Sequence, residues 1–127
     1  MPVNIEKQVA YWRQGAQEDL TTARLLFQHG KHKEALFFAH LAIEKALKAS
    51  VVKATGDLAP YSHDLPYLTE RAGVDLAPEQ AEFIGWMNQF AIRGRYPDLE
   101  RPLPSSSEIG QSLVKTEEIL QWLIQKL

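Results

Sequence analysis

The chain has 127 residues, the size of one ordinary globular domain, so we expect a single domain over residues 1–127. Apolar residues make up 45% and charged residues 24%, and these globular proportions exclude a disordered chain. The net charge of -2 excludes the broadly basic surface of a general nucleic-acid coat protein, and the lack of cysteine excludes disulfide scaffolds, cysteine nucleophiles and thiolate metal sites.

Two long helices are predicted in the first half, because residues 3–59 contain no proline. Apolar side chains recur at spacings of three and four, so the first helix should run from about residue 4 to about residue 29 and stop at Gly30. The following segment is apolar around most of its circumference, which predicts a central helix ending at Gly56 and antiparallel to the first. A stripe of alanines should let another helix approach it closely: Ala35, Ala39, Ala42, Ala46 and Ala49.

Three further helices are predicted in the second half. Asp64 can cap a short helix that stops at Gly73, and Pro78 suits the first residue of the next helix, which should end near Ile92. Residues 105–108 fit a capping box at the start of a last helix that continues to the final residue. No segment alternates as a strand. The predicted fold is therefore all-α, an antiparallel helical bundle of about five helices with a four-helix up-and-down core and one short helix.

The sequence also lacks the signals of membranes, metals and common cofactors. No stretch approaches the roughly 20 apolar residues that span a bilayer, and the N-terminal segment carries charges where a signal peptide needs its apolar core. The usual nucleotide and metal motifs are missing, and the four histidines are too scattered to predict a metal site. We expect a cytoplasmic protein with no membrane contact, no metal and no cofactor.

One polar group interrupts the central helix. His40, Glu44 and Lys48 stand at i, i+4 and i+8, so they share one face. One interpretation is that Glu44 and Lys48 pair on a solvated stripe while His40 is satisfied by a neighbour. The other is that Glu44 and Lys48 are buried or half-buried and meet the Arg-Gly-Arg-Tyr-Pro segment that contains Arg93 and Arg95. Guanidinium groups suit phosphate or carboxylate, so this segment is a phosphate or nucleotide site, a lock on Glu44, or an uninvolved loop.

Four segments follow one another along nearly the whole chain. They are Trp12 with Asp19-Leu20-x-x-Ala23, residues 35–49 (ALFFAHLAIEKALKA), His63-Asp64-Leu65-x-x-Leu68, and residues 93–97 (RGRYP). Their order and separation resemble a HEPN domain. The resemblance implies a small helical bundle, commonly dimeric, in a family named for a proposed nucleotide-binding role. It also implies a minimal nucleotidyltransferase as partner, because many prokaryotic members are encoded beside one in pairs that often behave as toxin and antitoxin.

The resemblance fails at the motif of the active members, which are metal-independent RNases with Arg-x4–6-His at the end of the fourth helix. The histidine positions counted from Arg93 and Arg95 hold Asp98, Leu99, Glu100, Arg101 and Pro102. The one literal match, Arg24 to His29, lies in the first predicted helix with its side chains about 140° apart, and we interpret it as chance. A carboxylate with a pKa near about 4 is a poor base at neutral pH, so neither acid replaces the histidine well.

The first hypothesis is a non-catalytic nucleotide- or RNA-binding module that acts with the nucleotidyltransferase. Arg93, Arg95 and Lys48 would bind phosphate, Tyr96 would stack on a base, and Glu44 and His40 complete the candidate site, with no catalytic residue assigned. The alternatives are an RNase with a degenerate motif, using Asp98, Glu100 or His29, and a purely structural homodimeric module. The apolar central helix and three tryptophans favour a homodimer in each case.

Overall fold

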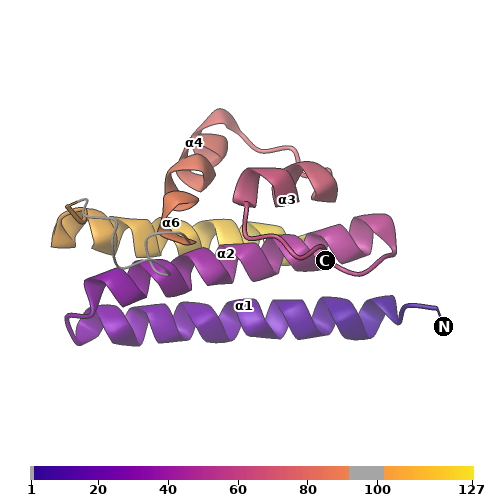
Figure 1. Cartoon of the computed structure of the whole chain (residues 1–127), viewed down its shortest axis with the longest axis horizontal. Helices are drawn as coiled ribbons and strands as arrows, with labels where there is room; N and C mark the ends of the chain where they lie inside the picture. Colours follow the sequence, from indigo (N-terminus) through magenta and orange to yellow (C-terminus); the bar gives the residue numbers. More distant parts are fainter. Residues whose placement is uncertain (1, 92–101) are drawn as a thin grey trace.

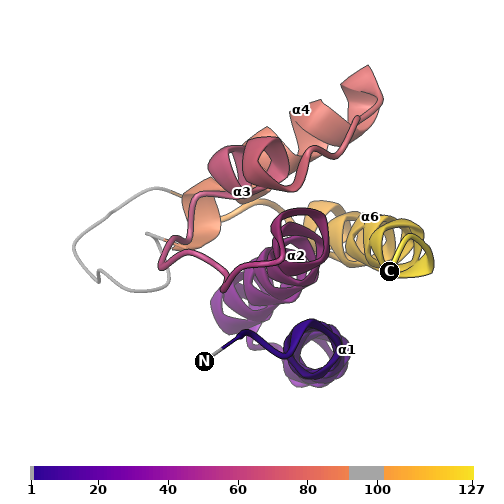
Figure 2. The ribbon, with the colours of Figure 1, turned by 90° about the vertical axis from the view of Figure 1, so that its right-hand side faces the viewer.

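The computed structural model describes residues 2–91 and 102–127, and this part of the chain forms five helices and no strand (Figure 1). The helices are α1 (Ile5–Gln28), α2 (His32–Thr55), α3 (Leu65–Ala72), α4 (Pro78–Met87) and α6 (Ser106–Gln125). Helices α1 and α2 form an antiparallel hairpin, and α3 and α4 lie on the side of α2 away from α1 (Figures 1 and 2). The predicted all-α helical bundle is confirmed.

Local side-chain and backbone signals set most helix ends. The Asn4 side chain accepts a hydrogen bond from the Lys7 backbone N–H at 3.0 Å, which caps the start of α1. Gly56 ends α2 in the left-handed conformation with φ +69°. Before α6, the Ser105 hydroxyl accepts from the Glu108 N–H at 3.1 Å, and the Glu108 carboxylate accepts from the Ser105 N–H at 3.3 Å. The predicted capping box is thus confirmed.

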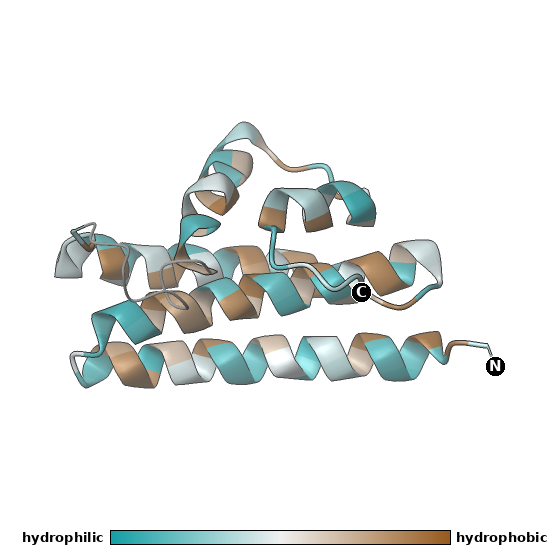
Figure 3. Cartoon of the chain, in the orientation of Figure 1, coloured by the Kyte–Doolittle hydropathy of each residue, from teal (hydrophilic) through white to brown (hydrophobic). Residues whose placement is uncertain are grey.

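Helix α2 is the central helix, because it packs against α1, α3 and α6. All five alanines of the predicted stripe are buried, so the neighbouring helices meet methyl groups and can approach its backbone closely. Larger side chains such as Leu36, Ile43 and Leu47 are also fully buried in the same core. Brown and teal turns alternate along α1 in Figure 3, as expected for a helix with one buried face. The core therefore lies around α2.

The N-terminus of α3 is not capped by Asp64 as the sequence predicts. Asp64 occupies the N-cap position of α3, but its side chain makes no capping hydrogen bond. Its carboxylate accepts a hydrogen bond from Asn88 Nδ2 at 3.1 Å instead, and Asn88 Oδ1 accepts from the Leu65 backbone N–H at 2.9 Å. A side chain from the end of α4 therefore satisfies the first backbone donor of α3.

Two helix ends also differ from the prediction. Helix α4 ends at Met87, and a turn at Asn88 separates it from a short helical piece at residues 89–91. The predicted end near Ile92 is therefore too late for α4, and Ile92 itself lies outside the described residues. Helix α6 ends at Gln125, slightly before the final residue, because its last backbone bonds tighten into turns.

Candidate functional site

The three polar residues predicted to share a face of α2 are all buried. His40 is 0% exposed, Glu44 3% and Lys48 6%, so the interpretation of a solvated stripe is wrong. The helix repeat does place them on one face, and that face points into the bundle. Burying a charge is costly unless another charge or a hydrogen bond compensates it, so each of these groups requires partners inside the protein.

Glu44 contacts the two other buried residues and one exposed histidine, and we call these four residues the Glu44 centre: His40, Glu44, Lys48 and His63. One carboxylate oxygen, Oε2, accepts a hydrogen bond from Lys48 Nζ at 3.2 Å. The other, Oε1, lies 2.9 Å from Nδ1 of His63 and 3.7 Å from Nδ1 of His40. Both oxygens of one buried carboxylate are therefore engaged, and the pairing of Glu44 with Lys48 that the sequence predicts is present.

Helix α1 contacts the Glu44 centre through Trp12, which packs against Lys48. Lys48 Nζ lies 5.1 Å from the centroid of the Trp12 ring, a cation–π contact. The ammonium is thus held between the Glu44 carboxylate and an indole ring, and the Lys48 side chain is only 8% exposed. The direct phosphate contact of Lys48 that the sequence predicts stays a prediction.

His63 is the member of the Glu44 centre that reaches the surface. It lies in the loop between α2 and α3, nineteen positions from Glu44, and its side chain is 54% exposed. The loop is anchored at the next residue, because Asp64 is bound by Asn88. Sequence reasoning missed this histidine as a site residue. The sequence does point to this position, because the His63-Asp64-Leu65 segment is one of the four that resemble the HEPN family. No function was assigned to its histidine from the sequence.

The predicted arginine cluster is outside the described part of the chain. Arg93, Arg95 and Tyr96 fall in residues 92–101, so the lock on Glu44 and the phosphate site both stay predictions. Arg24 and His29, the literal motif match, are described and do not form a site. Arg24 pairs with Glu117 of α6, and His29 is the exposed C-cap of α1.

The described residues offer no metal centre. Over residues 2–91 and 102–127, no three histidine, aspartate or glutamate side chains are grouped so that they could hold a metal ion. In the same ranges, no helix has the length and apolar character needed to cross a membrane. The Glu44 centre itself acts through hydrogen bonding and charge, because its buried carboxylate fixes an imidazole at the surface.

The comparisons with known proteins agree with this fold. The HEPN domain model matches residues 9–127. The crystal structure of TT1696 from Thermus thermophilus is similar with a TM-score of 0.82 and 24% identity, over 94% of this chain and 98% of that one. ST0689, an archaeal HEPN homologue, is similar with a TM-score of 0.70 and 20% identity, over 93% and 96% of the two chains. No curated protein shows significant sequence similarity. Because the family model covers nearly all of its length, the chain belongs to the HEPN domain family.

Proposed function

We propose that this chain is a non-catalytic nucleotide- or RNA-binding HEPN module that acts with a nucleotidyltransferase partner. The observation that carries the proposal is the contact between buried Glu44 and half-exposed His63, 2.9 Å apart. A buried carboxylate that orients a surface imidazole is typical of a site prepared for a ligand, because the ring is held in one position before the ligand arrives. An uninvolved surface histidine needs no such support.

The exposure of each side chain in the Glu44 centre decides the role that we propose for it. His40, Glu44 and Lys48 are buried and act as support, since a ligand cannot reach them without opening the bundle. His63 supplies the exposed contact from this group. Arg93 and Arg95 supply guanidinium groups for phosphate, and Tyr96 a ring on which a base can stack, as the sequence predicts.

The absence of catalysis is proposed from the sequence. The positions that hold histidine in the active members hold Asp98, Leu99 and Glu100 counted from Arg93. Labelled RNA incubated with excess protein and EDTA should therefore stay intact. Cleavage that Arg95→Ala removes would instead support the RNase with a degenerate motif.

Ligand binding is tested by differential scanning fluorimetry with ATP, inorganic phosphate and a short RNA. A ligand at 100 times its dissociation constant should stabilise the wild type by about 2.7 kcal/mol, and both His63→Ala and Arg95→Ala should lose most of that shift. Arg71→Ala is the matched control, because this exposed arginine of α3 lies outside the Glu44 centre. No shift of the wild type with any of the three ligands would overturn the binding proposal.

The partnership needs its own test. A tagged chain purified from its native cells should bring down a nucleotidyltransferase identified by mass spectrometry, and the pair should behave as toxin and antitoxin when each gene is expressed alone and together. Failure to recover such a protein would contradict the partnership and favour the structural homodimer. The buried pairing of Glu44 with Lys48 is compatible with that second candidate, because the two charges partner each other inside the bundle without any ligand.

A further inference from the structure

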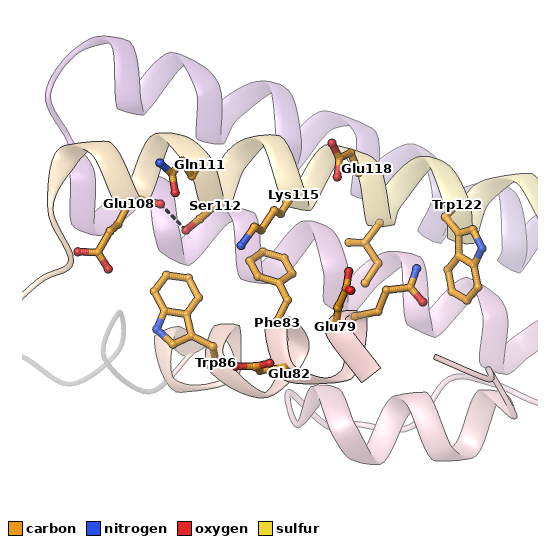
Figure 4. A pocket seen from close by; sticks show the side chains of 12 residues that line it. Glu79, Glu82, Phe83, Trp86, Glu108, Gln111, Ser112, Lys115, Glu118 and Trp122 are labelled. Carbon is orange, nitrogen blue, oxygen red and sulfur yellow. Dashed lines mark hydrogen bonds between the residues drawn. The ribbon is translucent and has the colours of Figure 1, made fainter. Parts of the chain in front are cut away.

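A groove of about 770 Å³ runs between α4 and α6 (Figure 4). Of these two helices, α4 packs mainly on α3, whereas α6 packs mainly on α1 and α2. Phe83 and Trp86 project from α4 toward α6, and Ile119 and Trp122 line the other wall. Three of these four side chains are aromatic and only partly buried, so the groove has an apolar floor that remains open to solvent.

The groove is long enough for a helix. The α6 residues that line it follow the i, i+3, i+4, i+7 repeat of a helix, so they form one face of it: Glu108, Gln111, Ser112, Lys115, Glu118, Ile119 and Trp122. At a rise of 1.5 Å per residue, the first and the last of them are about 21 Å apart along the axis. A small molecule would cover part of this length, whereas a helix of about four turns would cover all of it.

The rim of the groove is acidic. Glu79, Glu82, Glu108 and Glu118 line it and are all exposed, against one lysine, Lys115, among the lining residues. Within the described residues, Glu79, Glu82 and Glu118 take part in no ion pair. Among the described residues their charges have no ion-pair partner, and the surface around the apolar floor attracts positive charge.

We propose that the α4–α6 groove is the docking site for a basic amphipathic helix of a partner polypeptide. Apolar side chains of that helix would lie against Phe83, Trp86 and Trp122, and its lysines or arginines would face the glutamates of the rim. An amphipathic helix in a groove is a recurrent mode of peptide recognition, with anchors at the spacing of helix turns. The groove shares no residue with the Glu44 centre, so this surface goes beyond the proposed nucleotide site and does not depend on it.

The test uses a synthetic leucine–lysine peptide of about 14 residues, patterned as an amphipathic helix and free of tryptophan. Titration into the isotope-labelled full chain should shift the indole N–H signals of Trp86 and Trp122. The signal of Trp12 should stay in place, because that ring belongs to α1 and packs against Lys48 of α2, away from the groove. A peptide of the same pattern with glutamate in place of lysine should not bind, and affinity for the lysine peptide should fall as salt rises.

Two double variants that replace glutamates by lysines test the role of the acidic rim. Glu82→Lys combined with Glu118→Lys should weaken binding of the lysine peptide by about tenfold or more. Glu18→Lys combined with Glu70→Lys makes the same charge change at exposed positions of α1 and α3 and should weaken it by less than about twofold. Equal weakening by both pairs, shifts of all three indole signals, or no binding would overturn the proposal. So would a wild-type dimer that dissociates on Glu82→Lys with Glu118→Lys, because the groove would then be covered by a second copy.

Discussion

Asn88 and Asp64 are joined by a hydrogen bond of 3.1 Å between positions 24 apart in the sequence. The other side of the Asn88 amide accepts the Leu65 N–H at 2.9 Å, so one side chain fixes both the loop before α3 and the first turn of α3. His63 directly precedes this anchor and contacts Glu44. The end of α4 therefore helps to hold the exposed histidine of the Glu44 centre in position.

Asn88→Ala should destabilise the fold by about 1–3 kcal/mol, because it removes two hydrogen bonds and leaves a helix N-terminal donor unsatisfied. Urea unfolding measures the loss. Gln121→Ala is the control, since it removes an amide from the exposed face of α6 and should change stability by less than about 0.5 kcal/mol. Equal losses for the two variants would show that the Asn88 contact contributes nothing.

Glu44→Gln should cost about 3–5 kcal/mol, because it leaves the Lys48 ammonium buried beside a neutral amide. Lys48→Met in that background should restore a large part of the loss, since the second change removes the unpaired charge. A double-mutant cycle by urea unfolding measures the coupling between the two side chains. Simple additivity would contradict the pairing seen here.

Replacing Gly85 and Gly73 by alanine should change the stability of the fold in opposite directions. Gly85→Ala should stabilise the protein by about 0.5–1 kcal/mol, because Gly85 is inside α4 and an added Cβ meets nothing within 4 Å. Gly73→Ala should destabilise it by about 1–2 kcal/mol, because Gly73 ends α3 at φ +66°. Thermal unfolding of both variants checks the pair, and a shift of the same sign in both would contradict the backbone argument.

Arg95→Ala distinguishes a ligand-binding arginine from an arginine that locks Glu44. Under the proposed function, the melting temperature of the ligand-free variant should stay within about 2 °C of the wild type, while the shift with ATP is lost. Scanning fluorimetry with and without ATP measures both quantities. A fall of more than about 5 °C without ligand, with the ATP shift retained, would instead indicate a structural lock.

The helices could be predicted from the sequence because their boundaries depend on local chemistry. Gly30, Gly56 and Gly73 end helices with positive φ, and the capping box before α6 depends on residues three apart. The end of α4 could not be predicted in the same way. Asn88 is an ordinary helix residue by propensity, and its binding to Asp64 depends on the tertiary fold.

The candidate site was predictable only in part. Helical spacing correctly placed His40, Glu44 and Lys48 on one face, but it could not show whether that face was covered by other helices. His63 was not assigned to the site, because its contact with Glu44 depends on how the loop before α3 folds back onto α2. The Arg93 cluster remains a prediction from the sequence alone.

The α1–α2 hairpin has a consequence for the order of folding. Two 24-residue helices meet across a very short connection, so the contacts beside the turn cost little loop entropy and the later ones can form one after another outward from it. We expect the hairpin to form early, with Glu44, Lys48 and Trp12 already in place. The His63 loop and α4 would then dock last, so amide exchange should open them first and leave α2 protected.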